Sequence, residues 1–271
     1  MVAQSSFSRI KMVLICHHDD PINRVAVARW LASFTDLVGI ISIQEPGGRL
    51  WKRIRREMQR VGWWRFADVL AFRLYYRLFL AAKDGQWKQK TVAAMERRYA
   101  PLPDSCEILT TPSPNSPEAE AMLSRLQPDL VLARCKTLLS KRIFAIPRCA
   151  TLVMHPGVCP EYRNAHGCFW ALAKRDLDRV GMTLLRIDSG VDTGPVYGYY
   201  TYPYNEILES HIVIQERVVL ENLAALESKM NEIVQQRADL IDTSARDSRA
   251  WGQPWLSAYW RWKRAARRRQ T

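Results

Sequence analysis

A strand–helix–strand succession near the start of the chain constrains the fold most. Residues 11–16 and 37–43 are short apolar runs, and residues 22–33 between them carry apolar side chains at helical spacing. Two fully apolar strands joined by a helix are typical of a βαβ unit, whose strands are parallel and buried on both faces. The sequence therefore predicts an α/β fold with a mostly parallel sheet and helices on both faces.

The same alternation continues along the chain. Further strands or extended segments are expected at 107–110, 130–133, 150–154, 181–187 and 196–204. Helices are expected at 117–126, 141–146, 167–174 and 206–237, the first opened by Ser116-Pro117. The expected domains are an α/β domain (1–46 and 102–204), a helical insertion (47–101) and a C-terminal helix with a basic tail (205–271).

The insertion differs in composition from the rest of the chain. Between Arg49 and Arg98 there are 14 Lys and Arg against 4 Asp and Glu, with aromatic residues among them. Residues 259–271 repeat the pattern with 6 basic and no acidic residues. Because the whole chain carries +13, the remainder is mildly acidic.

Two interpretations of 49–98 and 259–271 stay open. A basic, aromatic, amphipathic helix is typical of a segment that lies on an anionic membrane surface. Alternatively, its apolar stripe packs on the core or across the interface of a homo-oligomer. No nucleic-acid-binding motif accompanies the charge, so a nucleic-acid partner is not expected.

Cysteine usage favours a reducing compartment. The six cysteines form no CxxC pair and several lie in apolar runs, which is typical of buried thiols. No secretory signal is visible, and the apolar stretch at 69–82 is too short to span a bilayer. We expect a cytoplasmic protein, peripheral to the inner face of the membrane if the basic segments bind it.

Polar residues at the ends of two predicted strands suggest catalysis. His155 ends the run 150–154 at a Pro-Gly break, and Asp192 lies in the glycine-rich loop 188–195 after the strand 181–187. Ligands of open α/β sheets bind beyond the carboxyl ends of the strands. A histidine and an aspartate there can act as a general acid/base pair.

The turn after the first strand reads His17-His18-Asp19-Asp20-Pro21. It resembles the metal-binding turn of LmbE-like zinc-dependent N-deacetylases, but a proline stands where that pattern has an acidic residue. The open alternatives are a metal site, a substrate contact through His17, His18 and Asp19, and a plain capped loop. We expect no metal.

Residues 128–199 together resemble the N10-formyltetrahydrofolate-dependent formyltransferase family. The resemblance rests on Gln127-Pro128-Asp129, His155-Pro156-Gly157 followed by Pro160-Glu161-Tyr162-Arg163, and Asp188-Ser189-Gly190-Val191-Asp192-Thr193-Gly194-Pro195. It implies a Rossmann-like sheet and transfer of a formyl group from 10-formyltetrahydrofolate to a small-molecule amine. An amino sugar on a nucleotide or lipid phosphate is one such acceptor.

The resemblance also implies roles for particular residues. His155 and Asp192 fall on the family's catalytic histidine and aspartate. The folate ring would lie against Lys136, Leu138, Leu139, Asp188 and Val191. From the residues themselves, Asn164 is a candidate catalytic donor, and Arg163 and His166 are candidate substrate contacts beside the His17 turn.

The chain departs from the family pattern at three places. Val153 stands where the family has an asparagine that donates to the oxyanion, and losing such a donor costs about 10²–10³ in rate. The first strand does not end in the phosphate loop of the purine enzyme. The chain after Pro195 is too short for the barrel of the methionyl-tRNA enzymes.

These departures leave alternatives to an active formyltransferase. One is a formyl hydrolase on the same fold. Another is a catalytically degenerate binding protein, in which Val153 marks lost chemistry. The third is the metal-dependent deacetylase suggested by the His17 turn.

Overall fold

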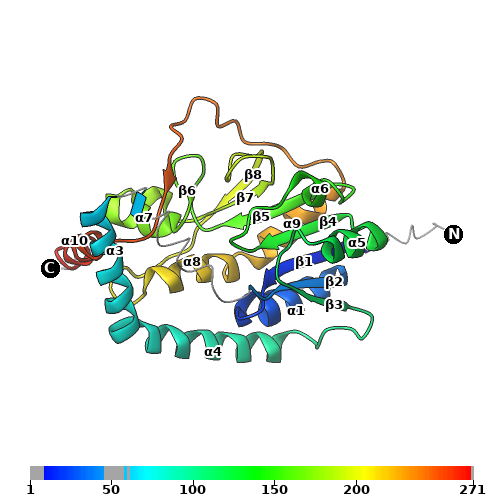
Figure 1. Ribbon diagram of the computed structural model, residues 1–271, viewed down its shortest axis with the longest axis horizontal. Coiled ribbons are helices and arrows are strands. Elements are labelled where there is room, and N and C mark those ends of the chain that lie inside the picture. The colour runs from blue at the N-terminus through cyan, green and yellow to red at the C-terminus, as the bar shows by residue number, and fades with distance from the viewer. Residues whose placement is uncertain (1–8, 46–57, 60–61, 270–271) are drawn as a thin grey trace. The chain divides into compact units, whose positions relative to one another are not determined.

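The computed structural model describes residues 9–45, 58–59 and 62–269. Its main strands are β1 (Lys11–His17), β2 (Asp36–Ile43), β3 (Glu107–Thr111), β4 (Leu130–Arg134), β5 (Ala150–His155), β7 (Met182–Arg186) and β8 (Val196–Tyr200). They form a mostly parallel sheet in the order β3-β2-β1-β4-β5-β7-β8, with β8 antiparallel to β7 (Figure 1). The predicted α/β fold is confirmed.

Helices separate most of these strands. They are the π-helical segment η1 (Ile22–Val27), α1 (Ala28–Phe34), α3 (Trp63–Tyr75), the π-helical segment η2 (Tyr76–Leu80), α4 (Ala81–Arg98), α5 (Pro117–Leu126), α6 (Lys141–Phe144), α7 (Gly167–Lys174), the 3₁₀ segment η3 (Leu177–Arg179), α8 (His211–Leu220), α9 (Leu223–Val234) and α10 (Leu256–Arg267). A second, two-stranded parallel sheet pairs β6 (Arg163–Asn164) with β9 (Ala250–Trp251).

Two helix starts show how local chemistry sets the boundaries. The Ser116 hydroxyl accepts from the Ala119 amide at 3.2 Å, and Pro117 occupies the first turn of α5, as predicted. Ser210 caps α8 in the same way, accepting from Val213 at 3.1 Å. The helix predicted at 206–237 therefore begins later than expected, and it is divided into α8 and α9.

The chain divides into two compact units. Unit 1 comprises residues 1–44, 92–152 and 224–238, and unit 2 comprises 45–91, 153–223 and 239–271. The boundary runs through β5 after Leu152, so both units contribute to that strand. The domain boundaries expected from composition stay a prediction.

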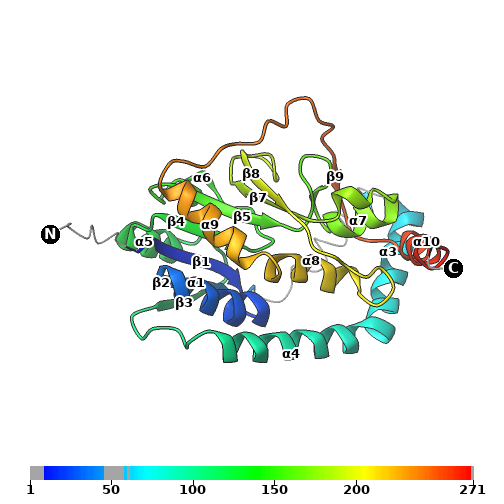
Figure 2. The same cartoon turned by 180° about the vertical axis from the view of Figure 1, so that it is seen from behind.

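Unit 1 is built around β1, which pairs in parallel with β2 on one side and β4 on the other. Met12, Leu14 and Leu132 on these strands are fully buried, as the apolar runs predict. At Gly39 in β2, a Cβ would lie 2.5 Å from the Met122 side chain of α5, so glycine permits this close helix contact. Figure 2 shows α9 in front of the same strands.

Unit 2 contains an aromatic core to which α3 of the insertion contributes. The ring of Phe72 in α3 lies 5.7 Å from Phe169, 5.5 Å from His211 and 5.4 Å from Tyr259, measured between centroids. Phe72 of the insertion's apolar stripe therefore packs within unit 2. His211 is buried, and burial holds the pKa of its imidazole well below the ordinary value.

The C-terminal segment is folded rather than a disordered tail. Tyr259 and Trp262 of α10 are buried, so residues 256–267 form a packed helix. Residues 47–57 and 60–61 of the expected insertion lie outside the described residues.

Candidate active site

His155 ends β5 and is held under the loop that follows it. Its Nε2 donates to the carbonyl oxygen of Tyr162 at 2.8 Å, and its side chain is only 4% exposed. The loop folds back because two glycines meet. A Cβ on Gly157 would lie 2.8 Å from the Gly167 Cα, and a Cβ on Gly167 would lie 2.5 Å from the Gly157 Cα. The Pro156-Gly157 turn after His155 therefore allows the following loop to pack closely over the His155 ring.

Asp192 completes a pair with this histidine. Its Oδ2 lies 3.2 Å from His155 Nδ1 and accepts from the backbone amide of Asn164 at 2.8 Å. The residue has φ 51°, in the left-handed region, which directs the carboxylate back from the loop between β7 and β8. The structure therefore brings together the two residues that the sequence placed at separate strand ends.

The geometry of the pair suits proton handling. With Nε2–H donated to Tyr162, the second ring nitrogen faces the Asp192 carboxylate. A proton can pass between Nδ1 and Oδ2 across this distance without rotation of either side chain. Both side chains are largely shielded from water, and the low local dielectric constant strengthens the interaction between the imidazole and the carboxylate.

The neighbours Asn164 and Arg163 hold this arrangement from the loop side. The Asn164 Nδ2 donates to the Trp251 carbonyl at 2.5 Å, leaving its second amide hydrogen for another acceptor. An Arg163 guanidinium nitrogen donates to the Val191 carbonyl at 2.7 Å. Both candidate residues thus connect the β6 loop with its surroundings, Arg163 directly to the residue before Asp192.

Val153 supplies no polar group to the site. It packs against a buried apolar cluster of Cys159, Leu185 and Val196. The position that carries an asparagine in the family pattern is therefore part of a hydrophobic core in this chain.

Asp188 and His166 lie in the same unit. The Asp188 carboxylate accepts from the Gly190 amide at 2.9 Å and from the Thr193 hydroxyl at 2.8 Å, which folds the loop that carries Asp192. His166 stands at the start of α7 with φ 56°, and its ring centroid lies 5.6 Å from that of His211.

The remaining predicted site residues lie in unit 1. The backbone amide of Lys136 donates to His17 Nε2 at 3.1 Å, and His18 Nδ1 lies 3.1 Å from the Ser42 hydroxyl. Asp19 is exposed, and so is Leu138, whereas Leu139 is buried. The structure thus brings the His17 turn and the loop after β4 together.

Two functional neighbours were missed by the sequence analysis. Asn115 fixes the loop after β4, donating to the Leu138 carbonyl at 2.8 Å and accepting from Ser140 at 2.7 Å. Trp251 stacks between Tyr162 and Trp170, at centroid distances of 5.8 and 4.8 Å. Neither contact has a local signal, because each joins residues distant in sequence.

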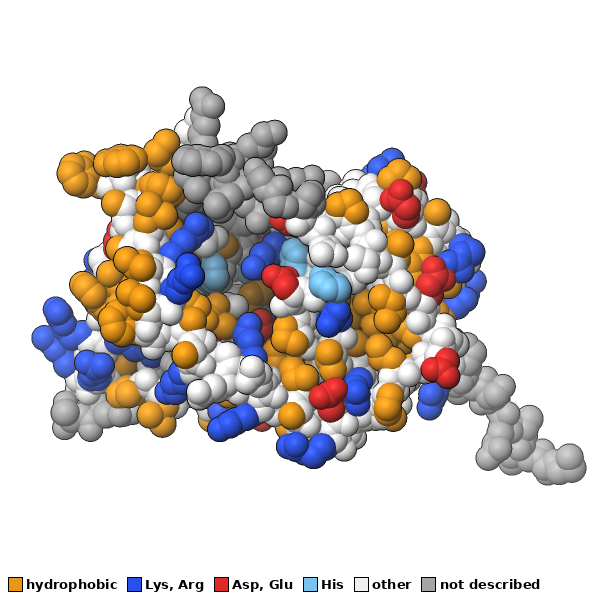
Figure 3. Space-filling view, turned by 60° about the horizontal axis from the view of Figure 1, so that its bottom comes forward, with side chains coloured by type: hydrophobic (Ala, Val, Ile, Leu, Met, Phe, Trp, Pro, Cys, Tyr) orange, Lys and Arg blue, Asp and Glu red, His pale blue; other side chains and the backbone are white. Residues whose placement is uncertain are grey.

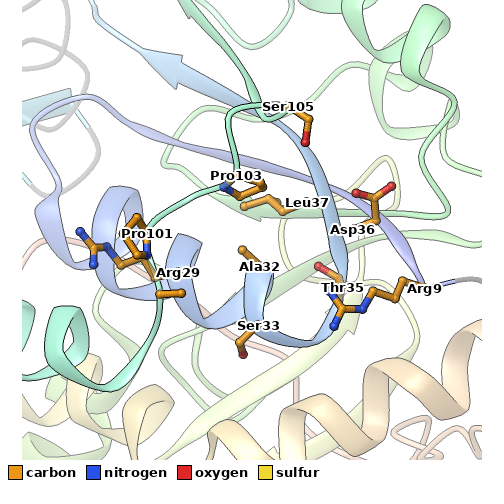
Figure 4. A pocket seen from close by; sticks show the side chains of 11 residues that line it. Arg9, Arg29, Ala32, Ser33, Thr35, Asp36, Leu37, Pro101, Pro103 and Ser105 are labelled. Carbon is orange, nitrogen blue, oxygen red and sulfur yellow. The ribbon is translucent and has the colours of Figure 1, made fainter.

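A separate cleft of about 240 Å³ lies in unit 1, lined by Arg9, Arg29 and Asp36 among others (Figure 4). Asp36 begins β2, so this cleft is at the amino end of that strand, whereas His17 ends β1. Arg29 is already paired with Glu96 at 2.9 Å. The cleft is thus not where the sequence places the ligand.

Within the residues that the structure describes, no group of three or more His, Cys, Asp and Glu side chains is arranged to hold a metal ion. All six cysteines are free thiols. None of the described helices is both long enough and apolar enough to cross a bilayer.

Comparison with known proteins supports the resemblance. Residues 83–211 match the model of the formyl transferase family. Methionyl-tRNA formyltransferase from Dehalococcoides mccartyi is 36% identical over 88 residues, which are 32% of this chain and 28% of that protein. The enzyme of the same name from Mycolicibacterium gilvum is 34% identical over 119 residues, 40% and 38% of the two chains. The matched region thus spans well under half of these relatives.

Solved structures share the fold. A sugar N-formyltransferase from a Shewanella species superimposes with a TM-score of 0.53 at 12% identity, over 89% of this chain and 76% of that one. Phosphoribosylglycinamide formyltransferase from Bacillus halodurans gives 0.51 at 12% identity, over 88% and 100%. At this identity the likeness concerns the fold alone.

Proposed function

We propose that this chain, whose residues 83–211 match the formyl transferase family, transfers a formyl group from 10-formyltetrahydrofolate to a small-molecule amine. The observation that carries the proposal is the His155–Asp192 pair, with Nδ1 and Oδ2 3.2 Å apart and Asp192 fixed by the Asn164 amide. A cytoplasmic location is part of the proposal, and the lack of a CxxC pair among the six cysteines of the sequence supports it.

The pair accounts for the proton in such a reaction. When bound, 10-formyltetrahydrofolate would supply the formyl carbon: the amine nitrogen bonds to it, the bond from that carbon to N10 breaks, and the amine's proton ends on N10. Asp192 would accept this proton from the attacking nitrogen and pass it on to N10. His155 would share the proton meanwhile, since its Nδ1 already faces Oδ2. The free hydrogen of the Asn164 amide is the proposed donor to the carbonyl oxygen.

We propose that 10-formyltetrahydrofolate, the formyl donor, contacts the residues that the resemblance implies, and these residues are found in both units. In unit 1, Leu138 offers a 63% exposed apolar side chain on a loop held by Asn115, which suits a flat heteroaromatic ring. Lys136 and Leu139 flank it. In unit 2, Asp188 and Val191 occupy the loop that carries Asp192.

The proposed acceptor is an amino sugar on a nucleotide or lipid phosphate. Arg163 and His166 are proposed to contact it in unit 2, and His17, His18 and Asp19 in unit 1. The fold shared with a sugar N-formyltransferase supports this choice, as does the difference of the His17 turn from a glycine-rich phosphate loop.

The test is a screen of amino-sugar nucleotides and simple amines with 10-formyltetrahydrofolate as donor. We expect at least one amine to be formylated, and His155→Asn and Asp192→Asn each to lower kcat by about 10²–10⁴. Asp178→Asn, an exposed carboxylate of the same unit outside the pair, is the matched control. Full activity in both site variants would contradict the assignment.

A catalytically degenerate binding protein is the second candidate, favoured by the packing of Val153 into an apolar cluster. It predicts that the folate donor binds but that no amine in the panel is formylated. A formyl hydrolase would instead release formate steadily with no amine present.

A further inference from the structure

The outward side of α3 and η2 carries a continuous apolar stripe. Its exposed members are 44 to 86% accessible and comprise Trp63, Trp64, Leu70, Leu74, Leu78 and Phe79. Leu70, Leu74 and Leu78 follow one another at spacings of four residues, and Trp63 lies seven residues before Leu70, so these four share one side of the helix, flanked by Trp64 and Phe79. The stripe from residue 63 to residue 78 is about 22 Å long at 1.5 Å per residue.

Helix α10 extends the same surface. The Tyr75 ring lies 4.9 Å from Phe79 and 6.2 Å from Trp260, which is 52% exposed. These rings join the two helices into one apolar area, which we call the α3–α10 face. In Figure 3 hydrophobic side chains gather at the left, where Figure 1 draws α3 and α10, with Lys and Arg side chains near them.

The exposure does not reflect loosely held helices. The opposite side of α3 buries Phe66, Val69 and Phe72, and Phe72 contacts Tyr259 of α10. Asp68 accepts hydrogen bonds from the amide and hydroxyl of Ser257. α3 therefore packs within the unit through one side, and among the residues that the structure describes its other apolar side is exposed.

Charge indicates what this face contacts. Across α3, η2 and α10 there are seven basic residues (Arg65, Arg73, Arg77, Arg261, Lys263, Arg264 and Arg267) and one acidic residue. That acidic residue, Asp68, is occupied by Ser257. Arg73 and Arg77 are exposed on the helix that carries the stripe. The partner must therefore be apolar at its centre and negatively charged at its surface.

We propose that the α3–α10 face docks on the surface of an anionic phospholipid bilayer. The leucines and Phe79 would enter the acyl boundary, the tryptophans would lie at headgroup level, and the arginines would contact lipid phosphates. A second copy of the chain fits less well, because a two-fold interface through this face would bring its exposed arginines close to those of the other copy. The inference is independent of the formyl-transfer proposal.

Sedimentation with vesicles tests the docking. We expect the full-length protein to bind phosphatidylglycerol vesicles at least tenfold more tightly than phosphatidylcholine vesicles, with binding falling as salt rises. The triple variant Trp64→Glu, Leu74→Glu, Phe79→Glu should lose at least tenfold in binding. All three side chains are exposed, so circular dichroism should show an unchanged fold.

The control is Ile108→Glu with Leu240→Glu, which adds acidic charge at similarly exposed apolar positions that are not members of the α3–α10 face. It should bind as the wild type does. Equal losses in both variants, or no vesicle binding by the wild type, would overturn the proposal. So would a concentration-dependent dimer that only the face variant dissociates. Since no donor or acceptor is added, the result is unaffected if formyl transfer fails.

Discussion

Val153 lies two residues before His155 in β5, and alternation along a strand directs both side chains to the same side of the sheet. The valine is therefore placed where an amide could approach the reacting oxygen, yet it contributes only to the cluster with Cys159, Leu185 and Val196. In the proposed reaction the Asn164 amide must then act as donor. This makes residue 153 the most informative single position.

Restoring an amide there tests whether the missing donor limits the rate. We expect Val153→Asn to raise kcat for formyl transfer by about 10-fold or more, since one such donor is worth about 10²–10³ in other enzymes. The polar group should also destabilise the fold by about 1–3 kcal/mol, because it enters an apolar cluster. Steady-state kinetics and urea unfolding measure the two effects.

Val153→Ala is the control, because it disturbs the cluster without adding a donor. Its stability should fall while kcat does not rise. If Val153→Asn loses stability with no gain in rate, then Asn164 or a backbone amide already fulfils the donor's role.

The sequence predicted the place of a single residue only where its immediate neighbours in the chain indicate a strand end. His155 and Asp192 each stand just after an apolar run, so their positions at strand ends follow from the pattern. Their 3.2 Å contact does not, because it depends on φ at Asp192 and on the loop that folds over His155. Asn115 gave no signal, since its role is a contact with a loop more than twenty residues away.

Among the elements, the short ladder of β6 and β9 holds the loop beside the candidate site. Arg163 pairs with Ala250 and Asn164 with Trp251, and the Trp251 ring stacks between Tyr162 and Trp170. Its Nε1 also donates to the Glu161 carbonyl at 2.8 Å. One aromatic side chain thus fixes both the loop and the helix that follows it.

Trp251→Ala should therefore affect stability and activity together. Removing a buried tryptophan costs about 3–5 kcal/mol, and the loosened loop would no longer place the Asn164 amide against Asp192. Trp251→Phe keeps the stacking and loses only the Nε1 hydrogen bond, a cost of about 1 kcal/mol. Chemical denaturation and kcat of the two variants check this; equal effects would show that stacking contributes nothing.

Elements were predictable in type more readily than in extent. Ser116-Pro117 marks the start of α5 by a local cap, and α5 begins where expected. Ser210 uses the same chemistry, but the apolar pattern from 206 onward hides it. The ladder of β6 and β9 has two residues in each strand, too few for any periodicity to indicate.

At the scale of the whole molecule, buried thiols link stability to alkaline pH. Burial raises the pKa of Cys16 and of Cys168 from about 9 to about 12. The folded state keeps these protons above pH 9, whereas the unfolded chain loses them. The stabilisation is thus complete below pH 9 and is lost as the pH rises towards 12.

We expect the free energy of unfolding, measured in urea with a reductant, to fall between pH 9 and 10.5. Each of the two thiols contributes about 1.4 kcal/mol per pH unit once the unfolded form is ionised. Burial lowers the Lys263 pKa to about 8, which acts in the opposite direction over the same range, but for a single group. Cys16→Ala with Cys168→Ala should flatten the slope. An unchanged slope would contradict the assignment.

The overall fold could be predicted because alternating apolar runs and helical segments determine a parallel sheet almost by themselves. The division into two compact units could not, because its boundaries fall within regular elements such as β5 and α4. The composition shows where charge and aromatic content change along the chain. A compact unit is instead defined by contacts between segments that are distant in the sequence.

The contact between Asn164 and Trp251 also affects the order in which the candidate site forms during synthesis of the chain. During synthesis, His155 and Asp192 leave the ribosome long before residue 251, so the loop that carries Asn164 has no β9 to pair with. A nascent or prematurely terminated chain can therefore display both members of the pair without the ladder that aligns them. In the proposed reaction, the pair would therefore be aligned for catalysis only late in translation, when the segment after Ala250 emerges.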